Sequence, residues 1–249
     1  MAIKNDLLVF KFQEGEIPIN ICEQLQAWDK LEYPIYCQST TSLPFLLKIL
    51  KSSIGNNCDF ILSVIRTDSN TIVFSKQHNL LDYDLFEDDT YFYFVFNPIA
   101  FDSELVSCTS YYIRIVFGSN VLTLTSILFV PVSNIDSLAK FELGNNIDLL
   151  DCAYSTGFKQ VFYLPNRFFY SDTKTFEDVK KDDFGNEKLI YRKITESRVA
   201  DYQNIHSIFS EVLSSFSMYD SIKVTAKGKV YEAINGNIST ANIKQADKE

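Results

Sequence analysis

The chain has 249 residues, enough for one large β-domain or two smaller domains, and 46% of them are apolar, which excludes wholesale disorder. Its formal net charge of −9 argues against tight nucleic-acid binding, because neutralising phosphates requires a basic surface. Glycine and proline are scarce, at 8 and 6 residues, which excludes collagen-like and low-complexity architectures.

Residues 1–34 are predicted to form an N-terminal arm. Leu7 to Phe12 is apolar enough for one strand, and a polar run containing Pro18 follows it. Trp28, the single tryptophan, can anchor the arm on a neighbouring chain or pack on the chain's own core, and both interpretations stay open. Met1 to Phe12 lacks the basic flank and long apolar run of a signal peptide, so we expect a protein made in the cytoplasm.

Residues 35–135 are predicted to form a β-sandwich. The 21 Phe and 14 Tyr of the chain favour pleated, half-buried surfaces, and glycine and asparagine mark turns about every ten residues. The clearest hairpin joins Tyr111–Phe117 to Val121–Val130 across Gly118. The apolar stretch 121–132 is too short to span a bilayer. The other predicted strands are Phe45–Leu50, Asp59–Arg66, Thr71–Ser75 and Tyr91–Asn97.

Residues 136–249 are predicted to form an α+β domain, with one amphipathic helix, 202–217, packed on a sheet. The helix has an apolar stripe at helical spacing, and Asp201 is placed to cap its N-terminus. An exposed turn is predicted at 182–187. The predicted strands here are Lys159–Leu164, Lys188–Thr195, Ser221–Ala226 and Val230–Ile234. The fold class as a whole is therefore mainly β.

A search for chemistry finds no catalytic residue, no cofactor motif and no metal-ligand spacing. The two histidines, His78 and His206, stand outside any motif, and nucleophile-elbow, zinc-helix and glycine-rich phosphate-loop patterns are missing. The five cysteines are widely spaced and are expected to be buried, reduced thiols. The acidic run Asp82–Asp89 can be a cation site or a solvated loop, and the loop is favoured because it lacks the ligand rhythm of an EF-hand. We expect no enzyme activity.

Aromatic residues instead suggest surfaces for protein contacts. Arg167 and the three aromatic residues that follow it carry a single charge, which is more typical of a strand edge or a protein interface than of a nucleic-acid site. Core packing is at least as good an interpretation of this run. The residues expected at an oligomer interface are Trp28, Tyr91, Tyr93, Phe168, Phe169 and Tyr170.

Three segments resemble, in order and spacing, small virion proteins of tailed phages that infect Bacteroides-type bacteria, including crAss-like phages. Tyr111–Val116 with Leu122–Val130 is similar to the hairpin that closes their N-terminal β-domain. The second segment is similar to the opening strand of their second domain and comprises Asn145–Asp148 with Tyr154 and Gly157–Leu164. The third segment is similar to the closing helix and hairpin of that domain and comprises Tyr191–Ile194 with Tyr219–Val224.

The resemblance implies a non-enzymatic ring component of the tail or the portal–tail neck, located in the virion and present in many copies. Its partners would be copies of itself and other tail or neck proteins, with no membrane and no tight nucleic-acid binding. A second hypothesis is a carbohydrate- or receptor-binding β-sandwich at a tail tip, for which Tyr91, Tyr93 and Asp88 could supply an aromatic platform. An enzyme of unknown type is a third, weaker hypothesis.

Overall fold

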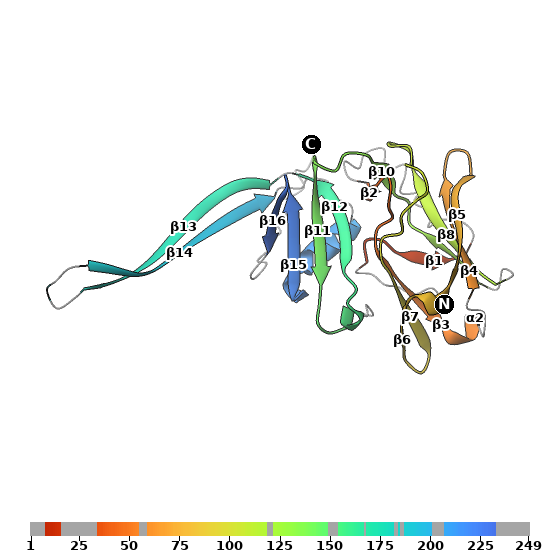
Figure 1. Ribbon diagram of the computed structural model, residues 1–249, viewed down its shortest axis with the longest axis horizontal. Helices are drawn as coiled ribbons and strands as arrows, with labels where there is room; N and C mark the ends of the chain where they lie inside the picture. Colours follow the sequence, from red (N-terminus) through yellow and green to blue (C-terminus); the bar gives the residue numbers. More distant parts are fainter. Residues whose placement is uncertain are drawn as a thin grey trace, which may run out of the picture. The chain divides into compact units, whose positions relative to one another are not determined.

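The computed structural model describes residues 8–15, 34–54, 59–118, 122–148, 154–166, 168–181, 184, 187–200 and 207–232. The chain forms two compact units. We call the first, Met1–Pro165 with Asn204–Glu249, the body, and the second, Asn166–Gln203, the hairpin unit. Strands dominate both units (Figure 1), which confirms the prediction of a mainly β fold.

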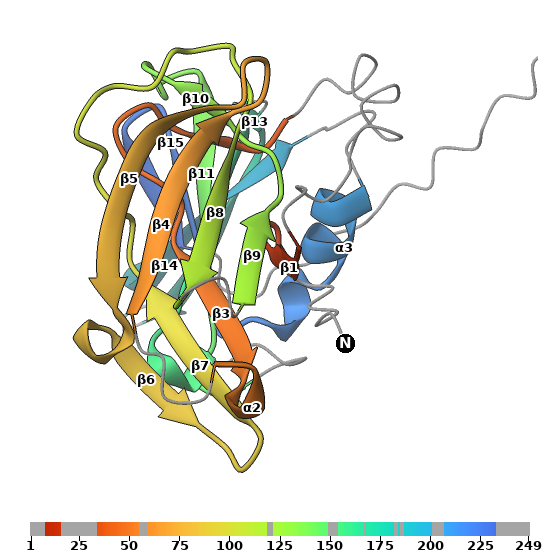
Figure 2. The same cartoon turned by 90° about the vertical axis from the view of Figure 1, so that its right-hand side faces the viewer.

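The larger sheet of the body has five strands in the order β1-β9-β8-β4-β5, and Figure 2 shows β5, β4, β8 and β9 side by side. In its centre the β4–β8 register sets Phe60 opposite Phe117 and Leu62 opposite Ile115, and all four are at most 1% exposed. Alternate residues of these strands therefore form one continuous apolar face. The strands are β1 Phe12–Glu14, β4 Asp59–Arg66, β5 Thr71–Asn79, β8 Tyr111–Phe117 and β9 Leu122–Ser126.

A three-stranded sheet, β3-β7-β6, supplies the other side of this core. Phe96 of β7 stacks on Phe45 of β3 with ring centroids 4.5 Å apart and lies 5.8 Å from Phe60 in the larger sheet. Phe12 lies 4.9 Å from Phe45, again between the two sheets. Aromatic side chains thus fill the space between the layers, as expected for a sandwich. The strands are β3 Phe45–Leu50, β6 Asp84–Glu87 and β7 Tyr91–Phe96, with α2 Lys51–Ile54 and the 3₁₀ turn η1 Leu80–Asp82 beside them.

The hairpin predicted across Gly118 is confirmed: β8 and β9 pair antiparallel, and Gly118 has a φ of 51°. The predicted strand Val121–Val130 is divided, because β9 ends at Ser126 and a separate short strand, β10 Val130–Val132, pairs with β2 Tyr36–Gln38. Positive φ is open to glycine without steric cost, which explains why the turn occurs at this residue.

Part of the predicted arm belongs to the core of the body. Leu8, Val9 and Phe10 are 0–4% exposed, and β1 pairs with β9. The backbone N–H of Val9 also donates to the Oε1 of Gln160, 2.6 Å away on β12. The predicted strand Leu7–Phe12 is displaced to Phe12–Glu14, because the three apolar residues before it pack into the core without pairing as a strand. Trp28 and the rest of 16–33 lie outside the described residues.

A four-stranded sheet of the body has the order β12-β11-β15-β16 and carries the predicted helix. Phe209 of α3 lies 5.7 Å from Phe162, which stacks on Phe141 at 5.0 Å, so an apolar helix face packs on this sheet. The helix spans Ser207–Ser214, and its predicted first residues, 202–206, are outside the described part. The elements are β11 Leu138–Gly144, η2 Tyr154–Thr156, β12 Gln160–Pro165, α3, η3 Phe216–Met218, β15 Ser221–Ala226 and β16 Lys229–Glu232.

The central strand of this sheet, β11, was not predicted, because its polar residues suggested a domain boundary. Ala139, Phe141 and Leu143 are buried, while Lys140 and Glu142 between them form a 3.1 Å ion pair. This is the period-2 pattern of a half-buried strand. The body therefore contains both the sandwich and the four-stranded sheet, whereas the predicted domains 35–135 and 136–249 divide the chain near β10.

The hairpin unit consists of β13 Phe168–Lys181 and β14 Glu187–Ala200, paired antiparallel. Each strand has 14 residues, more than twice the usual strand length, and spans about 45 Å at about 3.3 Å per residue. The register shifts between Tyr170 and Asp172 and again between Asp178 and Val179, and such bulges increase the local twist. Figure 1 shows the resulting twisted ribbon. The predicted strand Lys188–Thr195 covers the first part of β14, and β13 was not predicted.

Candidate assembly surfaces

The six residues predicted at an interface do not form one site among the described residues. Trp28 lies outside the described part of the chain. Phe168, Phe169 and Tyr170 begin β13, in register with Ala200, Val199 and Arg198 of β14, and the positions of their side chains are not described. Tyr91 and Tyr93 are half-buried on β7 of the body. Of the six predicted residues, Tyr91 and Tyr93 are the two whose side-chain geometry the structure describes.

Tyr91 and Tyr93 lie next to each other on one face of β7, with ring centroids 6.5 Å apart. Lys48 extends from β3, which pairs with β7, and its Nζ lies 4.4 Å from the Tyr91 centroid and 5.5 Å from that of Tyr93. An ammonium group over an aromatic face is attracted by the ring's negative potential. The lysine therefore occupies a ring face that a stacking ligand would use.

Asp88 joins this cluster through hydrogen bonds that also shape the β6–β7 turn. Its Oδ1 accepts from the backbone N–H groups of Thr90 and Tyr91 at 2.7 and 2.6 Å, and its Oδ2 accepts from the Tyr93 hydroxyl at 2.8 Å. These bonds, first that from the Tyr91 N–H, hold the pKa of Asp88 below its usual range. Both oxygens of the Asp88 carboxylate therefore accept hydrogen bonds from groups in or beside the turn.

In the part of the chain that the structure describes, no group of three or more Asp, Glu, His or Cys residues is placed to hold a metal ion, and this includes Asp82–Asp89.

The hairpin unit contains an exposed aromatic residue that the sequence analysis did not select. Phe184, in the connection between the paired residues Lys181 and Glu187, is 91% exposed, and Val179 on β13 is 43% exposed. Lys180 and Lys181 beside them are also exposed. The signal was available: Phe184 directly precedes Gly185-Asn186, a turn sequence between two strand-forming runs. An aromatic side chain with this exposure can contact the surface of another chain.

Charge is distributed unequally between the two units. Between Asn166 and Gln203 the sequence contains eight basic and eight acidic residues, so the hairpin unit is formally neutral. The body contains fifteen basic and twenty-four acidic residues and carries the whole net charge of −9. Strand β14 by itself has four basic and two acidic residues. The body surface is therefore acidic, and the hairpin is the segment that can approach another acidic body with least repulsion.

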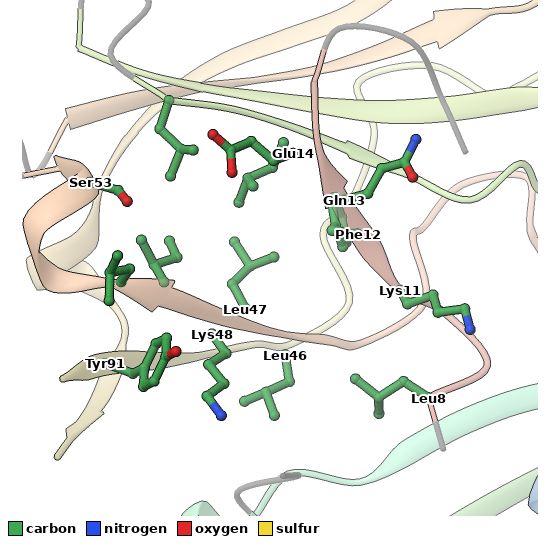
Figure 3. Close-up of a pocket in the computed structure, with 14 residues that line it drawn as sticks. Leu8, Lys11, Phe12, Gln13, Glu14, Leu46, Leu47, Lys48, Ser53 and Tyr91 are labelled. Carbon is green, nitrogen blue, oxygen red and sulfur yellow. The ribbon is translucent and has the colours of Figure 1, made fainter. Parts of the chain in front are cut away.

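A pocket of about 120 Å³ opens in the body between β1 and β3 (Figure 3). Its walls include Leu8, Leu47 and Leu122, and the Glu14 carboxylate lies on the pocket side of β1 while Lys11 and Gln13 point to the other side. Its lining residues include neither histidine nor cysteine. The pocket is the space left where the two sheets of the sandwich diverge.

The cysteines differ in their surroundings. Cys37 is 1% exposed, as expected for a buried cysteine, and burial raises the pKa of its thiol. Cys108 departs from that expectation, because it is exposed in the loop before β8, where it has a φ of 61°. Cys22, Cys58 and Cys152 lie outside the described residues.

His78 lies on β5 at the margin of the sandwich core. Its ring stacks on Phe60 at 5.3 Å, and its Nδ1 is 2.6 Å from the Tyr83 hydroxyl. Burial, then the positive charge of Lys76, lowers its pKa below the ordinary value of 6.5, although Asp82 opposes this. The folded protein therefore favours the neutral form of His78 more than the unfolded chain does.

This lowered pKa makes stability depend on pH. Below about pH 6.5 the unfolded chain binds a proton that the folded chain resists, so stability present above 6.5 is lost as the pH falls. We expect a lower melting temperature at pH 5.5 than at pH 7.5, measured by circular dichroism, and a smaller difference in His78→Gln. Tyr83→Phe should keep the wild-type difference, because burial is the main cause. Equal pH dependence in wild type and His78→Gln would contradict this assignment.

Neither known protein-family models, nor curated proteins, nor solved structures give a match to this chain. No helix in the described part of the chain is long and apolar enough to cross a membrane.

Proposed function

We propose that this chain is a structural virion protein of a tailed phage, forming a multi-copy ring in the tail or in the neck between portal and tail. The resemblance of three ordered segments to such proteins suggests it, and the mainly β body is compatible with it. The net charge of −9 supports the same proposal, because an acidic ring lets DNA pass without binding it. The expectation that the chain has no enzyme activity stays part of this proposal.

The observation that carries the proposal is the hairpin unit. It consists of two strands, and an isolated two-stranded ribbon is at best marginally stable in water. Glu177, Val179, Lys180, Lys181 and Phe184, the side chains described toward its connection, are all exposed. A ribbon of this length is stabilised when a neighbouring chain covers one of its faces or edges. Assembly with other chains supplies such cover.

The test is the mass of the purified full chain by light scattering after size exclusion, over a range of concentrations. We expect a discrete multiple of 28.6 kDa, and closed rings in electron micrographs of that fraction. A monomer at every concentration, with no assembly on addition of the other tail and neck proteins, would contradict the proposal.

A second candidate function is a carbohydrate- or receptor-binding module. The cluster of Tyr91, Tyr93 and Asp88 favours it, since aromatic rings beside a carboxylate are common in sugar sites. Lys48 over both rings counts against it, because the ammonium occupies the stacking face. Glycan binding by the monomer that is lost in Tyr91→Ala would establish this candidate in place of the ring.

A further inference from the structure

We propose that the β13–β14 hairpin of one copy docks on the acidic body of a second copy, with Phe184 as its apolar anchor. The inference rests on the proposed self-assembly and specifies the surface and the partner. Phe184 is 91% exposed, the highest exposure among the large apolar residues that the structure describes. Aromatic residues are enriched among the few side chains that dominate binding energy at protein interfaces.

The hairpin also has charged residues, whose positions follow from the register of its two strands. Glu177 is set opposite Arg192 and Lys181 opposite Glu187, whereas Lys180 is set opposite Lys188. The hairpin unit as a whole has a formal net charge of zero. Within the described residues, each strand pairs only with the other, so each has an outer edge. A β-edge can accept a further strand through backbone hydrogen bonds.

The surplus of basic residues on β14 favours a second copy's acidic body as the occupant. Two bodies, each with a net charge of −9, repel each other when they meet directly. The neutral hairpin, whose β14 strand has four basic and two acidic residues, meets an acidic body without that repulsion. Contact between copies through the hairpin is therefore favoured over contact between bodies.

The anchor is tested with the full chain and Phe184→Ser. We expect the concentration of half-assembly, measured by light scattering, to rise about tenfold or more, because loss of a central aromatic contact typically costs that much affinity. Leu81→Ser is the matched control: Leu81 is 75% exposed on the body, and we expect a change within about twofold. Circular dichroism and melting of both variants should match wild type, since both residues are exposed.

The charge argument has its own pair of variants. Lys180→Glu adds negative charge to the hairpin, and Lys227→Glu makes the same change in the β15–β16 turn of the body, where Lys227 is exposed. We expect Lys180→Glu to weaken assembly more than Lys227→Glu at low salt. The difference should be smaller at 0.5 M salt, where the Debye screening length is about 4–5 Å. Equal effects would remove the electrostatic basis of the proposal.

A capture experiment separates docking on the body from pairing between hairpins. Tagged wild type should retain untagged Phe184→Ser chain, whose body is intact, whereas tagged Phe184→Ser should not retain untagged Phe184→Ser. If tagged wild type cannot retain the variant, the hairpins meet each other and docking on the body is wrong. If Phe184→Ser assembles like wild type, the anchor is wrong although self-assembly stands. If wild type itself stays monomeric, the proposed self-assembly fails first.

Discussion

Phe96→Ala is expected to lower the free energy of unfolding by about 3–5 kcal/mol, the usual cost of removing a phenylalanine ring from a packed core. Phe96 is 0% exposed. Its ring lies 4.5 Å from Phe45, 5.8 Å from Phe60 and 4.4 Å from Tyr83, so it contacts both sheets of the sandwich. The alanine leaves a cavity that these three rings cannot fill without moving apart from their other contacts.

Urea denaturation followed by circular dichroism measures this loss as a lower midpoint. Phe86→Ala is the matched control, because Phe86 is 43% exposed on the edge strand β6, and it should cost less than about 1 kcal/mol. Similar losses in the two variants would mean that the rings between the sheets do not form a close-packed core.

Ser126→Ala is expected to cost about 1–3 kcal/mol, the usual cost of leaving a buried hydrogen-bonding group unsatisfied. The Ser126 hydroxyl is buried at the end of β9, accepts from the Ile113 N–H at 2.8 Å and donates to the Ile127 carbonyl at 2.8 Å. Alanine removes the acceptor for Ile113, which is 0% exposed and therefore has little access to water. The side chain takes the place of a backbone partner where the β8–β9 ladder ends.

The same urea titration checks this prediction, with Ser103→Ala as the control. Ser103 is exposed in the loop before β8, so its replacement should change stability by less than about 0.5 kcal/mol. A Ser126→Ala midpoint equal to that of the control would show that water satisfies the Ile113 N–H.

The core predictions and the assembly proposals depend on different parts of the molecule and can fail separately, whereas the docking proposal requires the proposed self-assembly. The core predictions concern the body alone and hold whether or not the chain assembles. The ring proposal depends on self-assembly, and the docking proposal depends on Phe184 and on the neutral charge of the hairpin unit. A variant that removes assembly while leaving the melting temperature unchanged would link the exposed ribbon to function rather than to folding.

The sequence by itself determined the features that are local. Strands β3, β4 and β8 begin and end as predicted, because alternating apolar residues and flanking turn residues act within a few positions of each other. The turn at Gly118 and the helix that includes Phe209 and Val212 follow from the same kind of local signal. For the candidate site, the sequence identified Tyr91, Tyr93 and Asp88, which the turn brings together over a short span.

Only the tertiary structure decided the features that depend on distant partners. Leu8–Phe10 belong to the core because β9 and Gln160 lie beside them, more than one hundred residues away in the chain. Strand β11 is central because β12 and β15 pair with it on both sides, which its mixed polar sequence does not reveal. The hairpin unit is separate because β13 and β14 pair with each other, and that pairing is what leaves Phe184 exposed. The alternation of apolar side chains depends on neighbouring residues in the sequence, whereas the partner that buries a strand depends on the whole fold.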